Sequence, residues 1–138
     1  MNRLSKFSVL LFCLAAAGCQ STAKYDIKNT AKLLRASVIE TNNAAPMMLD
    51  DETRLNSANA VGNKLNYLYT LVNTKVADVD VRQFVKVVTS QLMEATCLDN
   101  GMKTLVRHKV VVGYNYFDNE GNAIATIDVD TANCPANQ

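Results

Sequence analysis

The side chains of this 138-residue chain that could perform acid–base chemistry are its one histidine, His108, and the carboxylates of Asp128 and Asp130. Residues two apart in a β-strand lie on the same face, so the two aspartates could act together as a general acid and a general base. The same spacing suits a solvated strand edge, where charge discourages pairing with other chains. A lone histidine at a helix–strand junction is more often a capping or solvated residue. We therefore predict that the protein is not an enzyme and keep the aspartate pair as the alternative.

The other short motifs do not match a metal, nucleotide or cofactor site. The stretch "DNEGN" at 118–122 has acids like those of a calcium loop, but its glycine comes too early and Asp130 stands thirteenth where a glutamate should stand twelfth. Two distant cysteines and one histidine do not supply four zinc ligands at finger spacing. The sequence has no glycine-rich phosphate loop and no G-x-S-x-G motif. We therefore expect no metal and no cofactor.

The first 18 residues have the order of an export signal. Two basic residues precede an apolar run at 7–17, which is too short to span a membrane, since a span takes about 20 residues. Small residues at 15–18 directly precede Cys19, as a cleavage site requires. The stretch "LAAAGC" resembles the lipobox of bacterial lipoproteins. The resemblance implies that residues 1–18, with Cys13, are removed and that Cys19 becomes a lipidated N-terminus. The alternative is an ordinary secreted protein with an incidental cysteine.

The residues after Cys19 bear on location. In Gram-negative lipoproteins an aspartate directly after the lipidated cysteine commonly retains the protein in the inner membrane, so Gln20 is consistent with the periplasmic face of the outer membrane. Several acyl chains on Cys19 would anchor the protein stably, because one chain binds only marginally. Residues 19–25 then form a lipidated tether and residues 26–138 a single periplasmic domain. Because the six residues at 20–25 span about 20 Å at most, the domain should lie close to the bilayer.

Charge and cysteine content limit the partners and the redox state. The chain has 14 basic and 13 acidic residues, and two of the basic ones lie in the leader, so the remainder carries a net charge of −1. From this near-neutral balance we expect neither a basic stripe for nucleic acid nor a polybasic patch for anionic lipid. In an exported domain, the remaining cysteines, Cys97 and Cys134, predict one disulfide, with two separate thiols as the alternative. The bridge would close a 38-residue loop and stabilise the fold by about 4 kcal/mol.

The spacing of apolar residues predicts the elements that must position these groups. Helical spacing predicts helices at 26–41 and 81–96 and a further turn or two at 100–108. Alternation predicts strands at 64–72, 109–117 and 122–130. Asn and Gly content predicts a turn at 56–63, while 46–55 is a strand or a loop. The expected fold is α+β, with an antiparallel sheet of three to five strands packed against two or three helices on one face.

Four tyrosines form a candidate binding patch: Tyr67, Tyr69, Tyr114 and Tyr116. The members of each pair are two residues apart in an expected strand, so both rings of a pair point to one face. If the two strands are neighbours, the four rings share one surface. Tyrosine is favoured at binding surfaces because it supplies a large contact area with few rotatable bonds. An ordinary half-buried sheet face is the alternative.

The order of features from Leu33 to Cys134 resembles the small pilotin lipoproteins of the type II secretion system, of the kind with an antiparallel sheet, flanking helices and one disulfide. The stretch at 97–134 carries the resemblance. It has a cysteine, a helical segment, a tyrosine-containing strand, a turn with Gly121, a last strand and a closing cysteine. The lipobox and Pro46 after the first helix also fit. No partner-binding residue carries over, because no motif position for one matches.

These observations predict a non-enzymatic lipoprotein of the outer membrane that binds another envelope protein and helps to localise or assemble a secretion component. A sheet face, or a groove between helix and sheet, would accept a helix or strand of the partner. The alternative is an inhibitor or immunity lipoprotein that presents the acidic stretch "LDDETRL" at 49–55 to a toxic enzyme.

Overall fold

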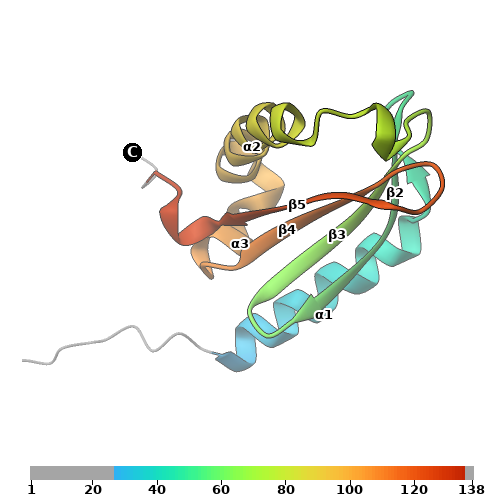
Figure 1. Ribbon diagram of the computed structural model, residues 1–138. Helices are drawn as coiled ribbons and strands as arrows, with labels where there is room; N and C mark the ends of the chain where they lie inside the picture. The colour runs from blue at the N-terminus through green and yellow to red at the C-terminus, as the bar shows by residue number, and fades with distance from the viewer. Residues whose placement is uncertain (1–26, 136–138) are drawn as a thin grey trace, which may run out of the picture.

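Two long helices lie on one face of a five-stranded sheet in the computed structural model, which describes residues 27–135 (Figure 1). The helices are α1 (Ile27–Ala44), α2 (Val81–Leu98) and the short α3 (Lys103–Arg107). The 3₁₀ turns are η1 (Val76–Asp78), η2 (Asn100–Met102) and η3 (Thr131–Asn133). The strands are β1 (Met47–Met48), β2 (Thr53–Val61), β3 (Lys64–Leu71), β4 (Val111–Phe117) and β5 (Ala123–Asp130). The predicted α+β class is confirmed.

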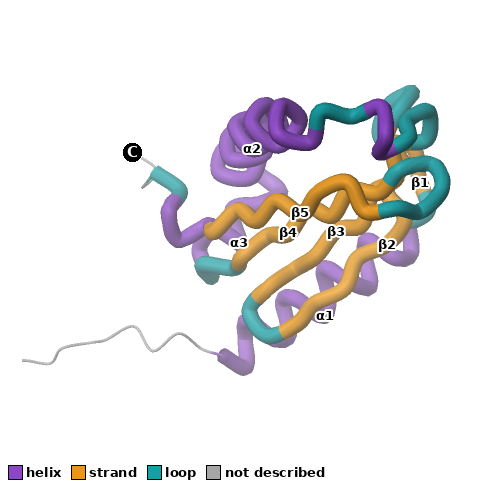
Figure 2. Tube along the Cα trace, viewed as in Figure 1, coloured by secondary structure: helices purple, strands orange, loops and turns teal. Residues whose placement is uncertain are grey.

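The sheet has one apolar and one polar face because its strands alternate. On β3, Leu65 is fully buried while Lys64 and Asn66 on either side point to the open face. Val112 of β4 and Val129 of β5 are paired and equally buried. Both long helices cover this apolar face, α1 beside β2 and α2 beside β5 (Figure 2). The core therefore lies between the helices and one face of the sheet.

The sheet is mixed rather than antiparallel. The strands lie in the order β1-β2-β3-β4-β5, and β3 pairs with β4 in parallel, whereas the other pairs are antiparallel. The connection explains this arrangement, because the 18 residues of α2 rise about 27 Å, which matches the length of the eight-residue strand β3. The chain thus returns to the end of the sheet where β3 begins, and β4 runs in the same direction. The prediction of an antiparallel sheet is wrong for this pair.

The segment predicted as a turn at 56–63 is mostly strand. β2 pairs along its length with β3, with a bulge between Leu55 and Ser57, and the turn itself is limited to Gly62 and Asn63. Gly62 has a φ of 58°, which glycine adopts at no steric cost. Asparagine and alanine are depleted in strands, so local composition hides β2. The first helix also runs past its predicted end, to Ala44.

One disulfide fastens the end of α2 to the segment after β5. Cys97 and Cys134 are joined across a Cα–Cα distance of 5.4 Å, which confirms the predicted bridge. Cys97 lies in the last turn of α2, and Cys134 directly follows η3. None of the described helices has the length and apolar character needed to cross a membrane.

Candidate binding groove

The four tyrosines singled out from the sequence come together on the apolar face of the sheet. The parallel register of β3 and β4 places Tyr67 opposite Tyr114 and Tyr69 opposite Tyr116. The ring centroids of these pairs are 6.0 Å and 5.3 Å apart. Tyr69 also stacks on Tyr114 across the diagonal at 6.2 Å. Because aromatic rings at such distances attract one another, the four side chains form one continuous aromatic surface.

Helix α2 packs on the β4 half of this surface through one polar and one aromatic contact. The hydroxyls of Thr96 and Tyr114 share a hydrogen bond of 2.6 Å, and the Thr96 side chain is fully buried. The rings of Phe84 and Tyr116 meet in a T-shaped arrangement, with centroids 5.2 Å apart and an interplanar angle of 82°. These contacts fix both ends of α2 against β4.

Helix α1 is held to the other half of the sheet by Asn42. Its side chain accepts a hydrogen bond of 2.7 Å from the backbone N–H of Ala58 and donates one of 3.0 Å to the carbonyl oxygen of the same residue. Ala58 follows the bulge in β2, and the bidentate contact satisfies both of its backbone groups there. Leu34, which is 2% exposed, anchors the helix by apolar contact.

The tyrosine hydroxyls are kept protonated by their surroundings. Burial raises the pKa of Tyr67, and a hydrogen bond with Thr41 offsets part of that effect. Burial likewise raises the pKa of Tyr114, with a partial offset from Thr96. Burial, followed by the charges of Tyr114 and Asp50, raises the pKa of Tyr116 to about 12. At neutral pH the floor is therefore uncharged and able to donate or accept hydrogen bonds.

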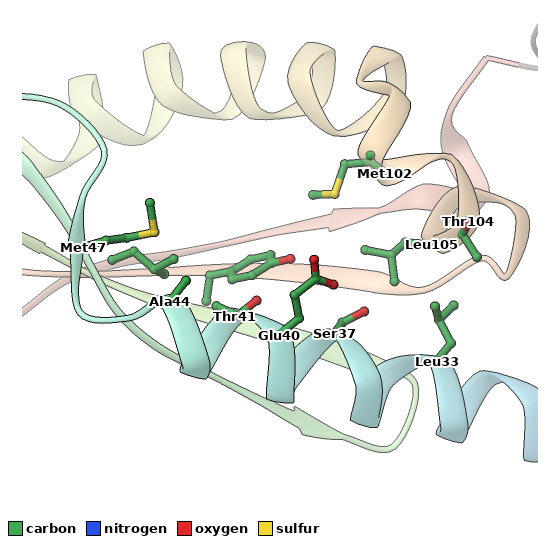
Figure 3. Close-up of a pocket in the computed structure, with 12 residues that line it drawn as sticks. Leu33, Ser37, Glu40, Thr41, Ala44, Met47, Met102, Thr104 and Leu105 are labelled. Carbon is green, nitrogen blue, oxygen red and sulfur yellow. The ribbon is translucent and has the colours of Figure 1, made fainter.

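Two adjoining hollows lie over the tyrosine floor, and we call them together the tyrosine groove. The first, of about 400 Å³, lies between α1 and the η2–α3 segment (Figure 3), and Tyr67 of β3 is among the residues that line it. In Figure 3, Ser37 and Thr41 face it from α1, and Met102 and Leu105 face it from the opposite side. The second, of about 630 Å³, lies between α2 and the loop that joins β1 to β2. Its floor is Tyr69, Tyr114 and Tyr116.

The charged side chains that line the groove are all acidic. Glu40 lines the first hollow, and Asp50, Glu52 and Asp78 line the second, while no lysine or arginine of the described residues lines either. The other lining residues are mainly aliphatic, aromatic or small polar side chains. An apolar floor with an acidic rim is complementary to an extended or helical segment that carries apolar side chains and lysine or arginine.

Asp118 braces the end of the groove next to η1. The residue is 1% exposed, and its carboxylate accepts hydrogen bonds from the backbone N–H groups of Val76, Glu120 and Asn122 and from the Asn122 side chain. Burial opposes ionisation most strongly, but these four hydrogen bonds outweigh it and lower the pKa of Asp118 to about 2. Asp118 thus links the β4–β5 turn to the segment before α2. In the acidic stretch at 118–122 it has a structural role, and not that of a calcium ligand.

The acid–base candidates lie apart from the groove. Asp128 forms an ion pair with Lys64 at 2.7 Å on the open face of the sheet. Asp130 accepts a hydrogen bond from the backbone N–H of Ala132. His108 shares a hydrogen bond of 3.0 Å between its Nδ1 and the hydroxyl of Thr30. No cluster of three or more metal-ligating side chains occurs within residues 27–135.

The acidic stretch at 49–55 is a turn and the start of β2. The Asp50 carboxylate accepts hydrogen bonds from the backbone N–H groups of Glu52 and Thr53, and the first of these is the main reason that its pKa is lowered. Because Leu49, Asp50 and Glu52 line the groove, the stretch forms part of its rim. The predicted leader at 1–18, the lipidation site Cys19 and the tether at 19–25 lie outside the described residues.

Sequence reasoning missed the polar side chains that attach α1 and α2 to the sheet on either side of the groove. Asn42 and Thr96 each contact a partner distant in sequence, and neither belongs to a motif. The position of Thr96 gave a weak signal. It lies beside a bridged cysteine at the end of an apolar helix stripe, where a small polar residue is expected to be buried and to need a hydrogen-bond partner. Nothing in the sequence indicated the role of Asn42.

Comparison with solved structures places this arrangement among known folds. The chain is similar to a Pseudomonas aeruginosa protein described as secreted, PA3611, with a TM-score of 0.68 and 18% identity over 79% of this chain and 96% of that one. It is also similar to the type II secretion system pilotin AspS of Vibrio cholerae, with a TM-score of 0.62 and 13% identity over 81% and 97%.

A third similar structure is the pilotin EpsS of the Vibrio vulnificus type 2 secretion system, with a TM-score of 0.60 and 12% identity over 80% of this chain and 96% of that one. The predicted resemblance to the pilotins is confirmed at the level of the fold. No protein family and no curated protein sequence matches the chain. Nothing among these similarities favours the inhibitor alternative.

Proposed function

We propose that this protein is a non-enzymatic lipoprotein of the bacterial envelope whose tyrosine groove binds a segment of a secretion-system protein and helps to localise or assemble it. The observation that carries the proposal is the groove itself, in which four contacting tyrosines and an acidic rim lie between two helices. The fold is shared with two type II secretion pilotins, which supports a partner of the same kind.

The chemistry of the groove specifies the bound segment. Leu, Met and aromatic side chains of the groove bury apolar residues of the partner, and the neutral tyrosine hydroxyls satisfy polar groups beside them. Glu40, Asp50, Glu52 and Asp78 attract lysine or arginine. The fitting partner is an amphipathic helix or strand with an apolar stripe bordered by basic residues.

Anchoring completes the proposed role. The "LAAAGC" stretch supports lipidation of Cys19, and Gln20 supports transfer to the outer membrane. A lipid-anchored protein that holds the partner through its groove brings that partner to the inner surface of the outer membrane. The polar contacts of Asp128 and Asp130 on the opposite face have no part in this role.

Localisation of the partner tests the proposal. Deletion of the gene should deplete a type II secretion component from the outer-membrane fraction, and the wild-type protein should restore it. Ser37→Trp fills the first hollow and should fail to restore it, because the bulky side chain occupies the space that the partner needs.

A matched control separates the groove from general damage. Ser90→Trp makes the same change on an exposed position of α2 that lines neither hollow, and it should restore localisation fully. Full restoration by Ser37→Trp, in a protein that melts at the wild-type temperature, would show that the groove is not the binding site.

A further inference from the structure

The outer side of α1 and the tip of the β2–β3 hairpin carry apolar side chains that the groove does not use. Ile27, Ile39 and Val61 are 78%, 55% and 72% exposed. Ala31 lies between Ile27 and Ile39 and lines two hollows formed by α1 and the hairpin. We call Ile27, Ala31 and Ile39 the outer α1 surface; Val61 is not part of it, because it pairs with Lys64 and so points to the open face of the sheet. Large aliphatic side chains gathered in this way commonly mark a contact with a partner or a membrane.

The charges beside the outer α1 surface are positive, a local basic stripe that the near-zero net charge of the chain did not predict. Lys28, Lys32 and Arg35 are exposed and recur at helical spacing, so they share one stripe of α1. The first acidic residue of the helix is Glu40, one turn before its end. Long basic side chains can keep their charged groups at a polar boundary while their stems cover apolar surface. Cations bordering exposed aliphatic residues are typical of a helix that lies on an anionic bilayer.

The connection to Cys19 limits how far this surface can be from a membrane. Ile27 follows Cys19 by eight residues, and eight residues span at most about 29 Å even when fully extended. If Cys19 carries the lipid, the start of α1 must therefore stay within that distance of the bilayer. Ile27 and the hairpin tip are close neighbours, since both Ile27 and Gly62 line the same hollow.

We propose that the outer α1 surface rests on the bilayer, with Ile27 and Ile39 at the level of the lipid headgroups and Lys28, Lys32 and Arg35 on anionic lipid phosphates. This inference relies on the lipid anchor of the proposed function and adds an orientation to it. Ser37 and Thr41, which line the groove, lie on the other side of α1 from the basic stripe. The docked domain therefore holds the tyrosine groove away from the membrane, where a partner can enter.

Tryptophan fluorescence provides a direct test, because the chain contains no tryptophan. Ile39→Trp is made in the full chain, which is expressed with its leader, purified and reconstituted in vesicles of phosphatidylethanolamine with phosphatidylglycerol as the anionic lipid. Lipids brominated near the headgroup quench a tryptophan that touches them. We expect the emission of the Ile39→Trp variant to shift to shorter wavelength and to lose most of its intensity in brominated vesicles.

Matched variants make the result specific. Val87→Trp, an exposed position on α2, should show neither the shift nor the quenching. Ile27→Trp repeats the test at the start of α1 in case the first substitution disturbs folding. Replacement of Lys28, Lys32 and Arg35 by glutamine in the Ile39→Trp background should lower the quenching to the level found in vesicles without anionic lipid.

Two results would overturn the inference, and they differ in what else they affect. Equal emission and quenching of the Ile39→Trp and Val87→Trp variants, in protein whose Cys19 is shown by mass spectrometry to be acylated, would show that the domain has no preferred face on the bilayer. That result leaves the anchor and the groove intact. An unmodified Cys19 in protein purified from envelopes would remove the anchor itself, and with it the premise of the docked orientation.

Discussion

The two walls of the tyrosine groove are attached to the sheet by different means. Helix α2 is joined covalently to the segment after β5 through Cys97 and Cys134, and Thr96 adds a buried hydrogen bond to the floor. Helix α1 is held by noncovalent contacts, chiefly the Asn42 side chain on Ala58 and the buried Leu34.

This difference shows which wall can adjust to a ligand. Displacing α2 means breaking or straining a covalent link, whereas displacing α1 means losing only hydrogen bonds and apolar contacts. We therefore expect α2 to be the fixed wall of the groove and α1 to be the wall that shifts when a partner enters.

Removing the covalent link should have the largest effect. Replacement of both Cys97 and Cys134 by alanine should lower the free energy of unfolding by about 4 kcal/mol, because the unfolded chain regains the entropy of the open loop. Urea denaturation measures the change. Reductant should destabilise the wild type by a similar amount and leave the double variant unaffected, and sensitivity of the double variant to reductant would contradict this explanation.

Releasing α1 from β2 should have the next largest effect. Asn42→Ala removes both hydrogen bonds to Ala58 and should lower the free energy of unfolding by about 2 kcal/mol, since the N–H and carbonyl groups at the bulge lose their partner. Asn43→Ala, at an exposed position one residue on, is the control and should change stability little. Equal effects of the two substitutions would show that Asn42 does not hold the helix.

The hydrogen bond between α2 and the floor should contribute less. Thr96→Val keeps the shape of the side chain and should cost about 1 kcal/mol, because the Tyr114 hydroxyl loses its partner. The loss should also raise the pKa of Tyr114 further, which spectrophotometric titration can detect. In the double variant with Tyr114→Phe the two costs should not add, and simple additivity would mean that the hydroxyls do not interact.

The contacts of Asp118, at the end of the groove next to η1, should lose their stabilising effect only in acid. The pKa of Asp118 is about 2 in the folded protein and 3.8 at its usual value, so the unfolded chain binds the proton more tightly. The contribution of Asp118 to the free energy of unfolding is therefore complete above about pH 4 and is lost as the pH falls toward 2. Melting temperatures at pH 5, 3 and 2 should fall more steeply for the wild type than for Asp118→Asn. Parallel profiles would rule out this role.

The sequence predicted the parts of the site that depend on local pattern. Alternation in 64–72 and 109–117 places each tyrosine pair on one face, and the structure confirms that these faces coincide. The export context and the count of cysteines identified the bridge between Cys97 and Cys134. Such features follow from the period of a strand or from the chemistry of one residue type, and they need no knowledge of distant contacts.

The features that were not predicted depend on pairing across the fold. The Ala- and Asn-rich strand β2 owes its conformation to β3 rather than to its own propensity. The parallel pairing of β3 and β4 follows from the length of the helix between them. The groove combines residues of α1, the strands and α3 that are far apart in sequence, so its volume and acidic rim could not be derived from any one segment.

Site-directed photo-crosslinking tests the central claim most directly. A photoreactive amino acid at Ser37 faces the first hollow, and the same residue at Ser90 on the exposed side of α2 is the matched control. Irradiation of intact envelopes should link position 37, and not position 90, to one type II secretion component through a segment with apolar and basic residues. Crosslinks to that component from position 90 but not from position 37 would contradict the account.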